Sequence, residues 1–451
     1  MRLFKRTLAI AISAMIPGMI AAQTAPVDTL SLSLQQCVEI SLQDNPTIKV
    51  ADLEVKRMDY SKKEVQANLF PAIDFSLAYQ RTIELQTMSM SMGGESTKIK
   101  MGTDNMWNAG FTASMPIINA ALWKSITMSE TQILASLESA RSSRLDMVNN
   151  VSKAYYALLL ANASRDVIRQ NYDIAVLNAD IYKKQFDQGT ASEYDVLRSS
   201  VQVTNIEPEL LQADIAIRQC ELQLKVLMGM DASVAIKPTV TLDQMRSDMF
   251  GYTASLNRSL ADNTSLRSLD IQSKLAKQNE TLKKFAWIPT LGISYNINWN
   301  ALSNGSPFSG QDFNPYSNVS LAIQVPIFSG GSKYFSLKQA KVQTKELELQ
   351  RENLVNSLNM QVDLAIDNIE KQVRQIQASE EGMRQAAKAY QIMQKSFEIG
   401  AASYLDLRDS ELANTSARLA YLQSIYNYLV SSSELDMLLG KENGFSSQTI
   451  R

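Results

Sequence analysis

One order of motifs occurs twice in this chain, about 210 residues apart. Each copy reads as a helix, a pair of alternating strands and a long helical hairpin. Helices resemble one another by chance, but chance does not reproduce prolines, glycines and strand pairs in the same order. The matching segments are Asp44–Pro46 with Asp262–Thr264, Leu69–Pro71 with Trp287–Pro289, Pro116–Ile118 with Pro326–Phe328, Phe186–Gly189 with Phe397–Gly400, and Met228–Gly229 with Leu439–Gly440. The chain is predicted to be a tube-like protein with two similar halves, residues 23–230 and 251–440, joined by a linker over residues 231–250.

The N-terminus has the pattern of an export signal. Residues 1–22 combine a basic start, an apolar run from Leu8 to Ile20 and a small pair, Ala21-Ala22. This pattern predicts a cleaved signal peptide. A membrane-spanning helix needs about 20 apolar residues, and this run is shorter and contains Pro17. No later segment qualifies, so any contact with a bilayer is expected through β-structure, which also satisfies its backbone hydrogen bonds in lipid.

The composition narrows the function further. The formal net charge is −2 and the sequence has no histidine. Nucleic acid is not an expected partner, because phosphate binding needs concentrated Lys and Arg. Without histidine the chain lacks the commonest general base and metal ligand, and no phosphate-binding glycine loop or nucleophile elbow is present. We therefore expect neither an enzyme nor a cofactor.

Four segments alternate apolar and polar residues, the pattern of strands with unlike faces. They cover residues 71–80, 107–118, 289–300 and 316–328. Each has about ten residues, enough to cross an outer membrane at a tilt. The polar positions are mostly Gly, Ser, Thr, Asn and Gln, which suits a wet lumen. A soluble sandwich also alternates, but it needs more than four strands to enclose a core. Aromatic residues fall near the strand ends, as in an interfacial girdle: Tyr79, Trp107, Trp299 and Tyr316.

Four strands are too few for a closed membrane barrel, whose minimum is about eight. Two copies of the chain would give about eight strands, a barrel nearly filled by its side chains. Three copies would give about twelve strands and leave an opening. The sequence therefore predicts an α+β membrane channel in which the trimer is the smallest assembly able to conduct.

The helical segments are unusually long. Apolar or small residues recur at steps of three and four from Ile133 to Phe186 and from Leu358 to Phe397. This period predicts left-handed coiled packing within two hairpins, residues 124–228 and 332–439. A helix over residues 124–187 would be roughly 95 Å long at about 1.5 Å per residue. Two shorter helices laid end to end, residues 46–68 and 192–228, would nearly match it. Residues 441–451 are polar and are expected to be a frayed tail.

The doubled motifs, together with Pro326–Gly331 and the Gly189-x5-Asp195-Val196-Leu197 turn, resemble the TolC-type outer membrane efflux family. The resemblance covers residues 31–440. It implies a homotrimer with a 12-stranded outer-membrane barrel, continued into the periplasm by a 12-helix α-barrel that narrows to a tip. It also implies a periplasmic adaptor and an inner-membrane pump as partners. The strand–helix junctions would lie at Pro71, Pro116, Pro289, Pro326 and Gly330. The first-half junction, residues 116–121, lacks the glycines of its second-half partner.

In such channels the hairpin tips form the periplasmic entrance. The resemblance implies an adaptor-docking surface at the turns Gly189-Thr190 and Gly400-Ala401. It also implies an aperture ringed by Asp195, Asp406 and Asp409, which favours cations. The alternative is helix capping, because Ser192 and Ser403 precede Asp195 and Asp406 at capping-box spacing. Arg198 occupies the first-half position equivalent to Asp409, and we expect it to lock the closed tip through an ion pair.

Three functions fit these features unequally. The first is a passive outer-membrane exit duct for small toxic compounds, powered by its partner pump. A type I protein secretion outlet has the same fold and is not separable by sequence. A trimeric coiled-coil surface fibre or adhesin would carry its strands once, at one terminus. Separately, Met88, Met90 and Met92 alternate in a loop region, either as a Cu(I) site or, as we favour, as a flexible strand extension.

Overall fold

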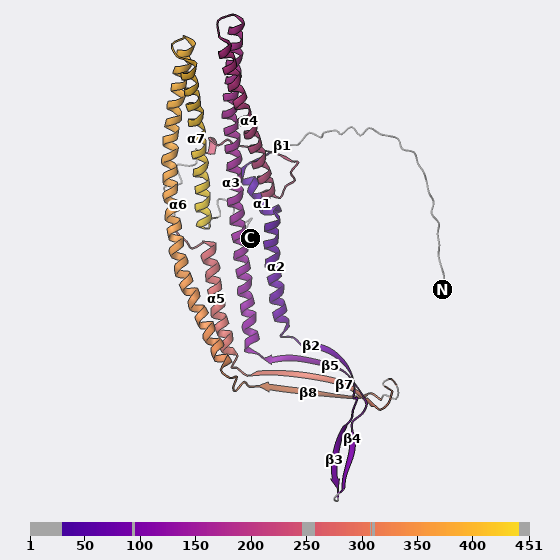
Figure 1. The fold of residues 1–451 in the computed structure, drawn as a ribbon. Helices are drawn as coiled ribbons and strands as arrows, with labels where there is room; N and C mark the ends of the chain where they lie inside the picture. The colour runs from indigo at the N-terminus through magenta and orange to yellow at the C-terminus, as the bar shows by residue number, and fades with distance from the viewer. Residues whose placement is uncertain (1–28, 93–94, 246–257, 307, 309–311, 442–451) are drawn as a thin grey trace, which may run out of the picture.

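The computed structural model describes residues 29–92, 95–245, 258–306, 308 and 312–441. The predicted signal peptide therefore lies outside the described residues, as do the end of the linker and all but the first residue of the tail. The described chain is an elongated bundle of helices with one sheet across its end (Figure 1). A second, smaller hairpin extends beyond the strand ends that lie farthest from the helices (Figure 1).

The sheet joins the two halves of the chain. Its four antiparallel strands are β2 (Ala72–Arg81), β5 (Asn105–Ile118), β7 (Thr290–Ser303) and β8 (Asn314–Gln324), in the order β2-β5-β7-β8. Each half supplies one adjacent pair, and β5 of the first half pairs with β7 of the second. The alternation predicts a last strand through residue 328, but β8 ends at Gln324. Pro326 follows and has no N–H to continue a ladder.

The register places the apolar sets of all four strands on one face. Phe75, Phe111 and Ile297 lie opposite one another across β2, β5 and β7, and Ile73 lies in the row that reaches Val319 of β8. The other face carries a row of polar side chains in which Thr112 donates to Asn296 at 2.9 Å. Every residue of β2 and β8 is exposed, and Ile73 and Val319 are 71% and 68% exposed. No element of the described chain covers the apolar face of these outer strands.

Two long helices rise from the sheet. They are α3 (Ala120–Asp187) and α6 (Ser332–Glu398), of 68 and 67 residues, hence about 100 Å each at about 1.5 Å per residue. Each turns back into a shorter helix, α4 (Glu193–Met228) or α7 (Tyr404–Leu438). The shorter helices α2 (Pro46–Ala67) and α5 (Thr264–Phe285) pack beside the sheet ends of α3 and α6.

The shorter helices meet end to end in both halves, α2 with α4 and α5 with α7, and an asparagine side chain bridges each junction. Asn45 caps α2, and its Nδ2 donates to the carbonyl of Leu227 at 2.8 Å near the end of α4. Asn263 caps α5 and donates to the carbonyl of Leu438 at 2.7 Å near the end of α7. An asparagine supplies both an acceptor for the helix it starts and a donor for the helix that ends there.

The hydrophobic core lies at mid-height, around α1 (Leu34–Asp44). Strand β1 (Thr29–Leu32) pairs in parallel with β6 (Ala235–Pro238) of the linker, so the linker packs against the helices. Buried members of this core include Cys37, Val38, Tyr155, Leu158 and Leu224. Within the described residues, no helix has an apolar stretch long enough to cross a membrane.

The small hairpin lies where the alternating methionines predicted a strand extension, but its second strand was not predicted. It consists of β3 (Gln86–Met92) and β4 (Glu95–Met101). Met88 is opposite Ile99, and both side chains are exposed. The alternating methionines therefore belong to a strand of a two-stranded hairpin.

Candidate functional site: the hairpin tips

The two helical turns lie next to each other at the end farthest from the sheet (Figure 1). Gly189 and Gly400 have φ of 74° and 73°, the left-handed conformation that ends a helix without a Cβ clash. The N–H of Thr190 donates to Gln185 O at 2.8 Å, and the N–H of Ala401 donates to Ser396 O at 2.8 Å. Gly189, Thr190, Gly400 and Ala401 are all exposed, so the predicted docking turns are open to a partner.

Both predicted capping boxes are present. The N–H of Asp195 donates to Ser192 Oγ at 3.2 Å, and the N–H of Ser192 donates back to Asp195 Oδ2 at 3.2 Å. Ser403 and Asp406 repeat this arrangement at the start of α7 with the same distances. Hydrogen bonds from the side chain and then the backbone of Ser403 lower the pKa of Asp406 below its usual range. Asp195 and Asp406 therefore both cap helices, and Asp406 stays ionised in mildly acidic solution.

Asp409 is not part of the cap. It lies one turn beyond Asp406 and is exposed. The two carboxylates are three positions apart in the sequence, so they lie on one face of α7. In the described part of the chain, Asp409 has no salt-bridge partner.

Arg198 contacts an aromatic ring where an ion pair was expected. Its guanidinium carbon lies 5.0 Å from the centre of the Tyr404 ring, a cation–π contact between α4 and α7. Tyr404 also meets Tyr182 of α3 edge to face, with ring centroids 5.5 Å apart and planes at 90°. Phe397 lies 6.3 Å from the same ring. Tyr182, Arg198, Phe397 and Tyr404 form the tip cluster, which ties the first hairpin to the second.

The residues of the tip cluster are half-buried. Burial raises the pKa of Tyr404, with a smaller contribution from Glu411, while Arg408 and Arg198 act in the opposite direction. Burial likewise raises the pKa of Tyr182. Excluding water strengthens the attraction between a cation and a ring. The heptad spacing indicated that Tyr182 faces a seam, but nothing in the sequence identified Tyr404 as its partner.

A buried carboxyl lies below the tip cluster. Glu411 Oε1 is buried and has no hydrogen-bond partner among the described residues. Burial raises the pKa of Glu411, and the charge of Arg408 opposes that shift. An unsatisfied buried acceptor destabilises the packed state.

Between the tips and mid-height, polar side chains connect α3 with α7. Arg418 donates to Gln170 Oε1 at 2.7 Å, and Ser433 donates to Asn149 Oδ1 at 2.9 Å. Lys153 forms an ion pair with Glu434 at 2.6 Å. The two halves thus touch along α3 and α7 through these side-chain bonds as well as through apolar residues of the core such as Leu158 and Ile425.

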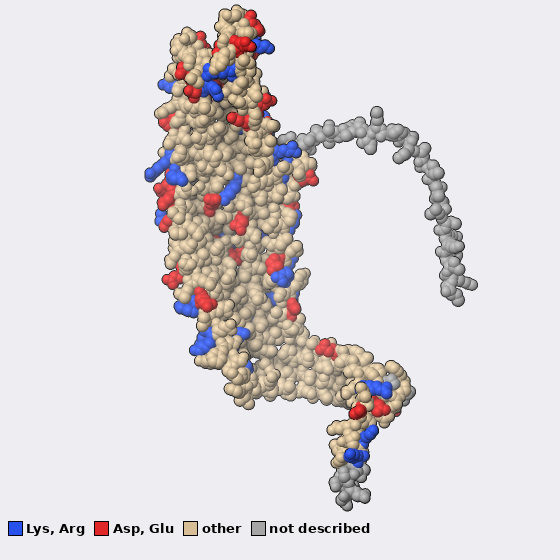
Figure 2. All heavy atoms as spheres, viewed as in Figure 1, with Lys and Arg blue, Asp and Glu red and all other residues tan. Residues whose placement is uncertain are grey.

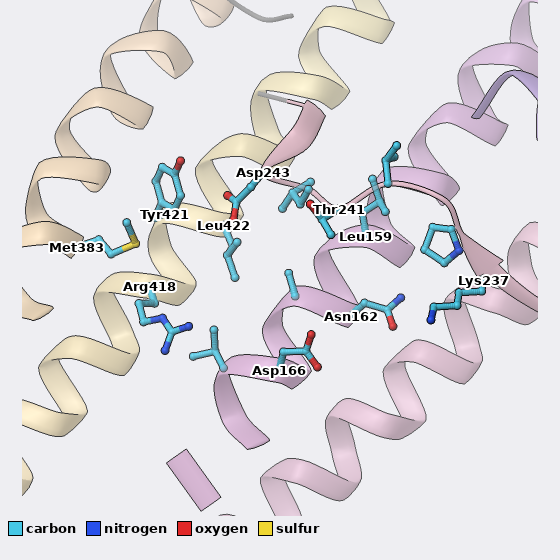
Figure 3. Close-up of a pocket in the computed structure, with 15 residues that line it drawn as sticks. Leu159, Asn162, Asp166, Lys237, Thr241, Asp243, Met383, Arg418, Tyr421 and Leu422 are labelled. Atoms are coloured by element: carbon cyan, nitrogen blue, oxygen red, sulfur yellow. The ribbon is translucent and has the colours of Figure 1, made fainter. Parts of the chain in front are cut away.

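A cavity of about 460 Å³ lies between α3 and α7 at mid-height (Figure 3). Its walls come from α3, α6, α7 and the linker after β6. Leu159, Leu242 and Leu422 form apolar walls, while Asp166 and Arg418 lie toward one side in the close-up.

The strand–helix junctions also have defined geometry. Pro71 and Pro289 directly precede β2 and β7, and Pro116 lies beside a register shift in β5. Gly330 has a φ of 60°, in the left-handed region, two residues before α6. Its first-half counterpart has no glycine. There, Asn119 caps α3 by accepting from the N–H of Leu122 at 3.1 Å, which resolves the junction whose geometry the sequence left open.

No metal-binding cluster accompanies these features. Among the residues that the structure describes, no three His, Cys, Asp or Glu side chains are grouped to hold an ion.

A sheet with an exposed apolar face, carried by helices about 100 Å long, defines the subunit of an outer-membrane channel. Residues 37–230 and 255–441 match the model of the outer membrane efflux protein family, and the chain belongs to this family. The two matched segments follow the two halves of the chain. The predicted family and the outer-membrane location are thereby confirmed.

Known proteins agree with this assignment. The outer membrane protein TolC of Vibrio cholerae is 20% identical over 339 residues, 74% of this chain and 77% of its own. The alkaline protease secretion protein AprF of Pseudomonas aeruginosa is 22% identical over 92% of this chain and 85% of its own. The solved open state of the MtrE outer membrane channel of Neisseria gonorrhoeae aligns with a TM-score of 0.70 and 18% identity, covering 97% of this chain and 98% of that one. Efflux and secretion channels are thus the relatives, and the surface-fibre alternative has no support.

Proposed function

We propose that three copies of this chain form an outer-membrane exit duct for small toxic compounds, driven by a periplasmic adaptor and an inner-membrane pump. The observation that carries the proposal is the sheet, whose outer strands expose apolar side chains such as Ile73 and Val319. Burying that face in lipid removes its cost in water. The sheet carries only two charged residues in its four strands, Asp74 and Arg81.

The edges of the sheet support the trimer. In the described chain, β2 pairs only with β5 and β8 pairs only with β7, so each has one edge without a ladder partner. Unpaired backbone groups are not tolerated in hydrocarbon. Pairing β2 of one copy with β8 of the next satisfies both edges. Three copies then give a barrel of about twelve strands with an opening, continued by a 12-helix α-barrel.

We assign the periplasmic aperture to the tips. Asp195, Asp406 and Asp409 contribute carboxylates, with the last two on one exposed face of α7. Rings of carboxylates favour cations. The turns Gly189-Thr190 and Gly400-Ala401 dock the adaptor, and Arg198 holds the closed aperture through Tyr404. The chain itself needs no catalytic group or cofactor in this role.

The mass and conductance of the detergent-purified protein test the assembly. We expect a mass of three chains and discrete single-channel currents in planar bilayers. A monomer without conductance would contradict both the trimer and the duct.

Selectivity tests the aperture. The double variant Asp406→Asn/Asp409→Asn keeps an oxygen that caps α7 but removes the charges. Its cation preference is expected to fall in asymmetric salt. The matched control, Asp187→Asn/Glu398→Gln, removes two exposed tip charges outside the aperture and should leave the preference unchanged. Equal effects of the two variants would refute the assigned ring.

Protein secretion remains a second candidate because AprF, a secretion protein by name, is similar over 92% of this chain. Deleting the gene separates the two functions. If the channel serves efflux, the deletion strain should be more susceptible to toxic compounds and should secrete the same set of proteins. Loss of a secreted protein without a change in susceptibility would favour the secretion outlet.

A further inference from the structure

The four helix ends next to the sheet are strongly basic. The ten residues of α2, α3, α5 and α6 that lie nearest the sheet in each helix contain nine lysines but three acidic residues in all, although Lys and Arg number 44 and Asp and Glu 46 in the whole chain. Figure 2 shows the visible face of the sheet with few charges and basic side chains where the helices begin. We call these lysines the collar: Lys62, Lys63, Lys124, Lys277, Lys283, Lys284, Lys333, Lys338 and Lys341.

Exposed aromatic side chains lie at the same level. They come from both strand–helix junctions of the second half and from their first-half equivalents. The exposed set is Phe70, Trp123, Trp287, Tyr334 and Phe335. The ammonium group of Lys338 lies 5.5 Å from the centre of the Tyr334 ring. Aromatic and basic residues together are typical of the headgroup level of a membrane.

Some collar lysines already have partners. Lys62 pairs with Glu130 at 3.1 Å, and Lys63 pairs with Asp59 at 2.8 Å. Lys284 pairs with Glu280 at 2.8 Å. Lys277 is 3.7 Å from Glu348, and Lys333 donates to a backbone carbonyl at 2.7 Å.

Four collar lysines have no carboxylate within salt-bridge distance in the described part of the chain: Lys124, Lys283, Lys338 and Lys341. They come from three helices that converge on the sheet. Lys124 also lines a cavity of about 510 Å³ between α3, α5 and α6, with Lys274 and Lys277. The same lining contains the hydroxyl groups of Ser273 and Thr281, the guanidinium of Arg351 and two carboxylates, Asp270 and Glu348, so cations outnumber carboxylates by four to two. The excess positive charge therefore lies beside space that can take a polar group.

We propose that the collar binds anionic phospholipid headgroups of the phosphatidylglycerol type, in the leaflet that meets the helices. The inference rests on the proposed function, in which the sheet crosses the bilayer. Each lysine near an anionic surface favours binding by about 1 kcal/mol, roughly fivefold, and the attraction falls off within a Debye length. Zwitterionic phosphatidylethanolamine has no net charge and gains little. The collar thus sets the depth of the channel in the membrane and the lipids around it.

The test uses the full-length protein reconstituted in bilayers of equal phosphatidylglycerol and phosphatidylethanolamine. Lipids retained after mild detergent extraction are measured by mass spectrometry. We expect phosphatidylglycerol to be enriched on the wild-type protein and the enrichment to fall at least tenfold in Lys124→Gln/Lys283→Gln/Lys338→Gln/Lys341→Gln. High salt should reduce the wild-type enrichment.

A matched control removes four exposed lysines far from the sheet: Lys183→Gln/Lys371→Gln/Lys388→Gln/Lys395→Gln. It makes the same change in net charge and should keep the enrichment. Equal enrichment in the wild type and the collar variant, or equal loss in the control, would overturn the inference. Single-channel conductance is recorded on the same samples. If the wild-type protein conducts but does not enrich phosphatidylglycerol, only the proposed lipid binding by the collar is refuted. If it does not conduct, the proposed function as an exit duct is refuted.

Discussion

Replacing Tyr404 by alanine should weaken the link between the two helical hairpins. Its ring makes two contacts with the first hairpin, the edge-to-face pair with Tyr182 at 5.5 Å and the cation–π contact with Arg198 at 5.0 Å. The contact with Phe397 lies within the second hairpin and does not bear on the link.

The size of the effect follows from these contacts. An aromatic pair contributes about 0.5–1.5 kcal/mol beyond its buried area. A partly exposed cation–π contact contributes about 0.5–1 kcal/mol. Tyr404→Ala should therefore shift the balance between joined and separated hairpins by about 1–2.5 kcal/mol per chain, roughly 5- to 70-fold.

Planar bilayers measure this shift as conductance and open probability. If the hairpins part to open the aperture, the Tyr404→Ala channel should show larger or more frequent openings than the wild type. Tyr404→Phe keeps the ring and should behave like the wild type. Tyr194→Ala removes a tyrosine of α4 that is 68% exposed near the same tip, and it should also leave the currents unchanged.

Two outcomes would refute the reasoning. If Tyr404→Ala and the wild type conduct alike, the tip cluster does not hold the aperture closed. If Tyr404→Phe opens the channel as Tyr404→Ala does, the phenol hydroxyl and not the ring contacts carries the effect.

Two further predictions concern stability. Because burial raises the pKa of Glu411, the folded state binds its proton more tightly, and the free energy of unfolding should fall as pH rises from the ordinary glutamate range through the raised folded pKa. Glu411→Gln should reduce the difference between the melting temperatures measured at about pH 5 and at about pH 7.5. A difference as large as that of the wild type would contradict the assignment of this pH dependence to Glu411. Gly440→Ala should lower the melting temperature far more than Gly400→Ala. Both glycines have positive φ, which costs an alanine about 1–2 kcal/mol at either site. Only at Gly440 would the added Cβ overlap the carbonyl of Asp262, because nothing lies within 4 Å of a Cβ at Gly400. Similar decreases in melting temperature for the two variants would exclude the clash.

Much of the fold followed from local patterns. The alternation in residues 71–80 and 289–300 indicated strands with one apolar face, and the structure has β2 and β7 there. Heptad spacing indicated the long helices, and the glycine turns indicated where each hairpin reverses. These signals are local because side-chain periodicity follows from the backbone geometry of a helix or strand. The spacing of Ser192 and Asp195 likewise predicted a cap that the structure contains.

The partners of those elements could not be read from the sequence. The pairing of β5 with β7, the contact of Arg198 with Tyr404 in place of an ion pair, and the convergence of lysines from four helices all join residues far apart in the chain. Periodicity states which face of an element is apolar, but not which other element covers it. The chain sequence by itself thus determined two halves, their strands and their helix lengths. Only the tertiary structure decided which faces stay uncovered and which charges gather, because these depend on packing between distant segments.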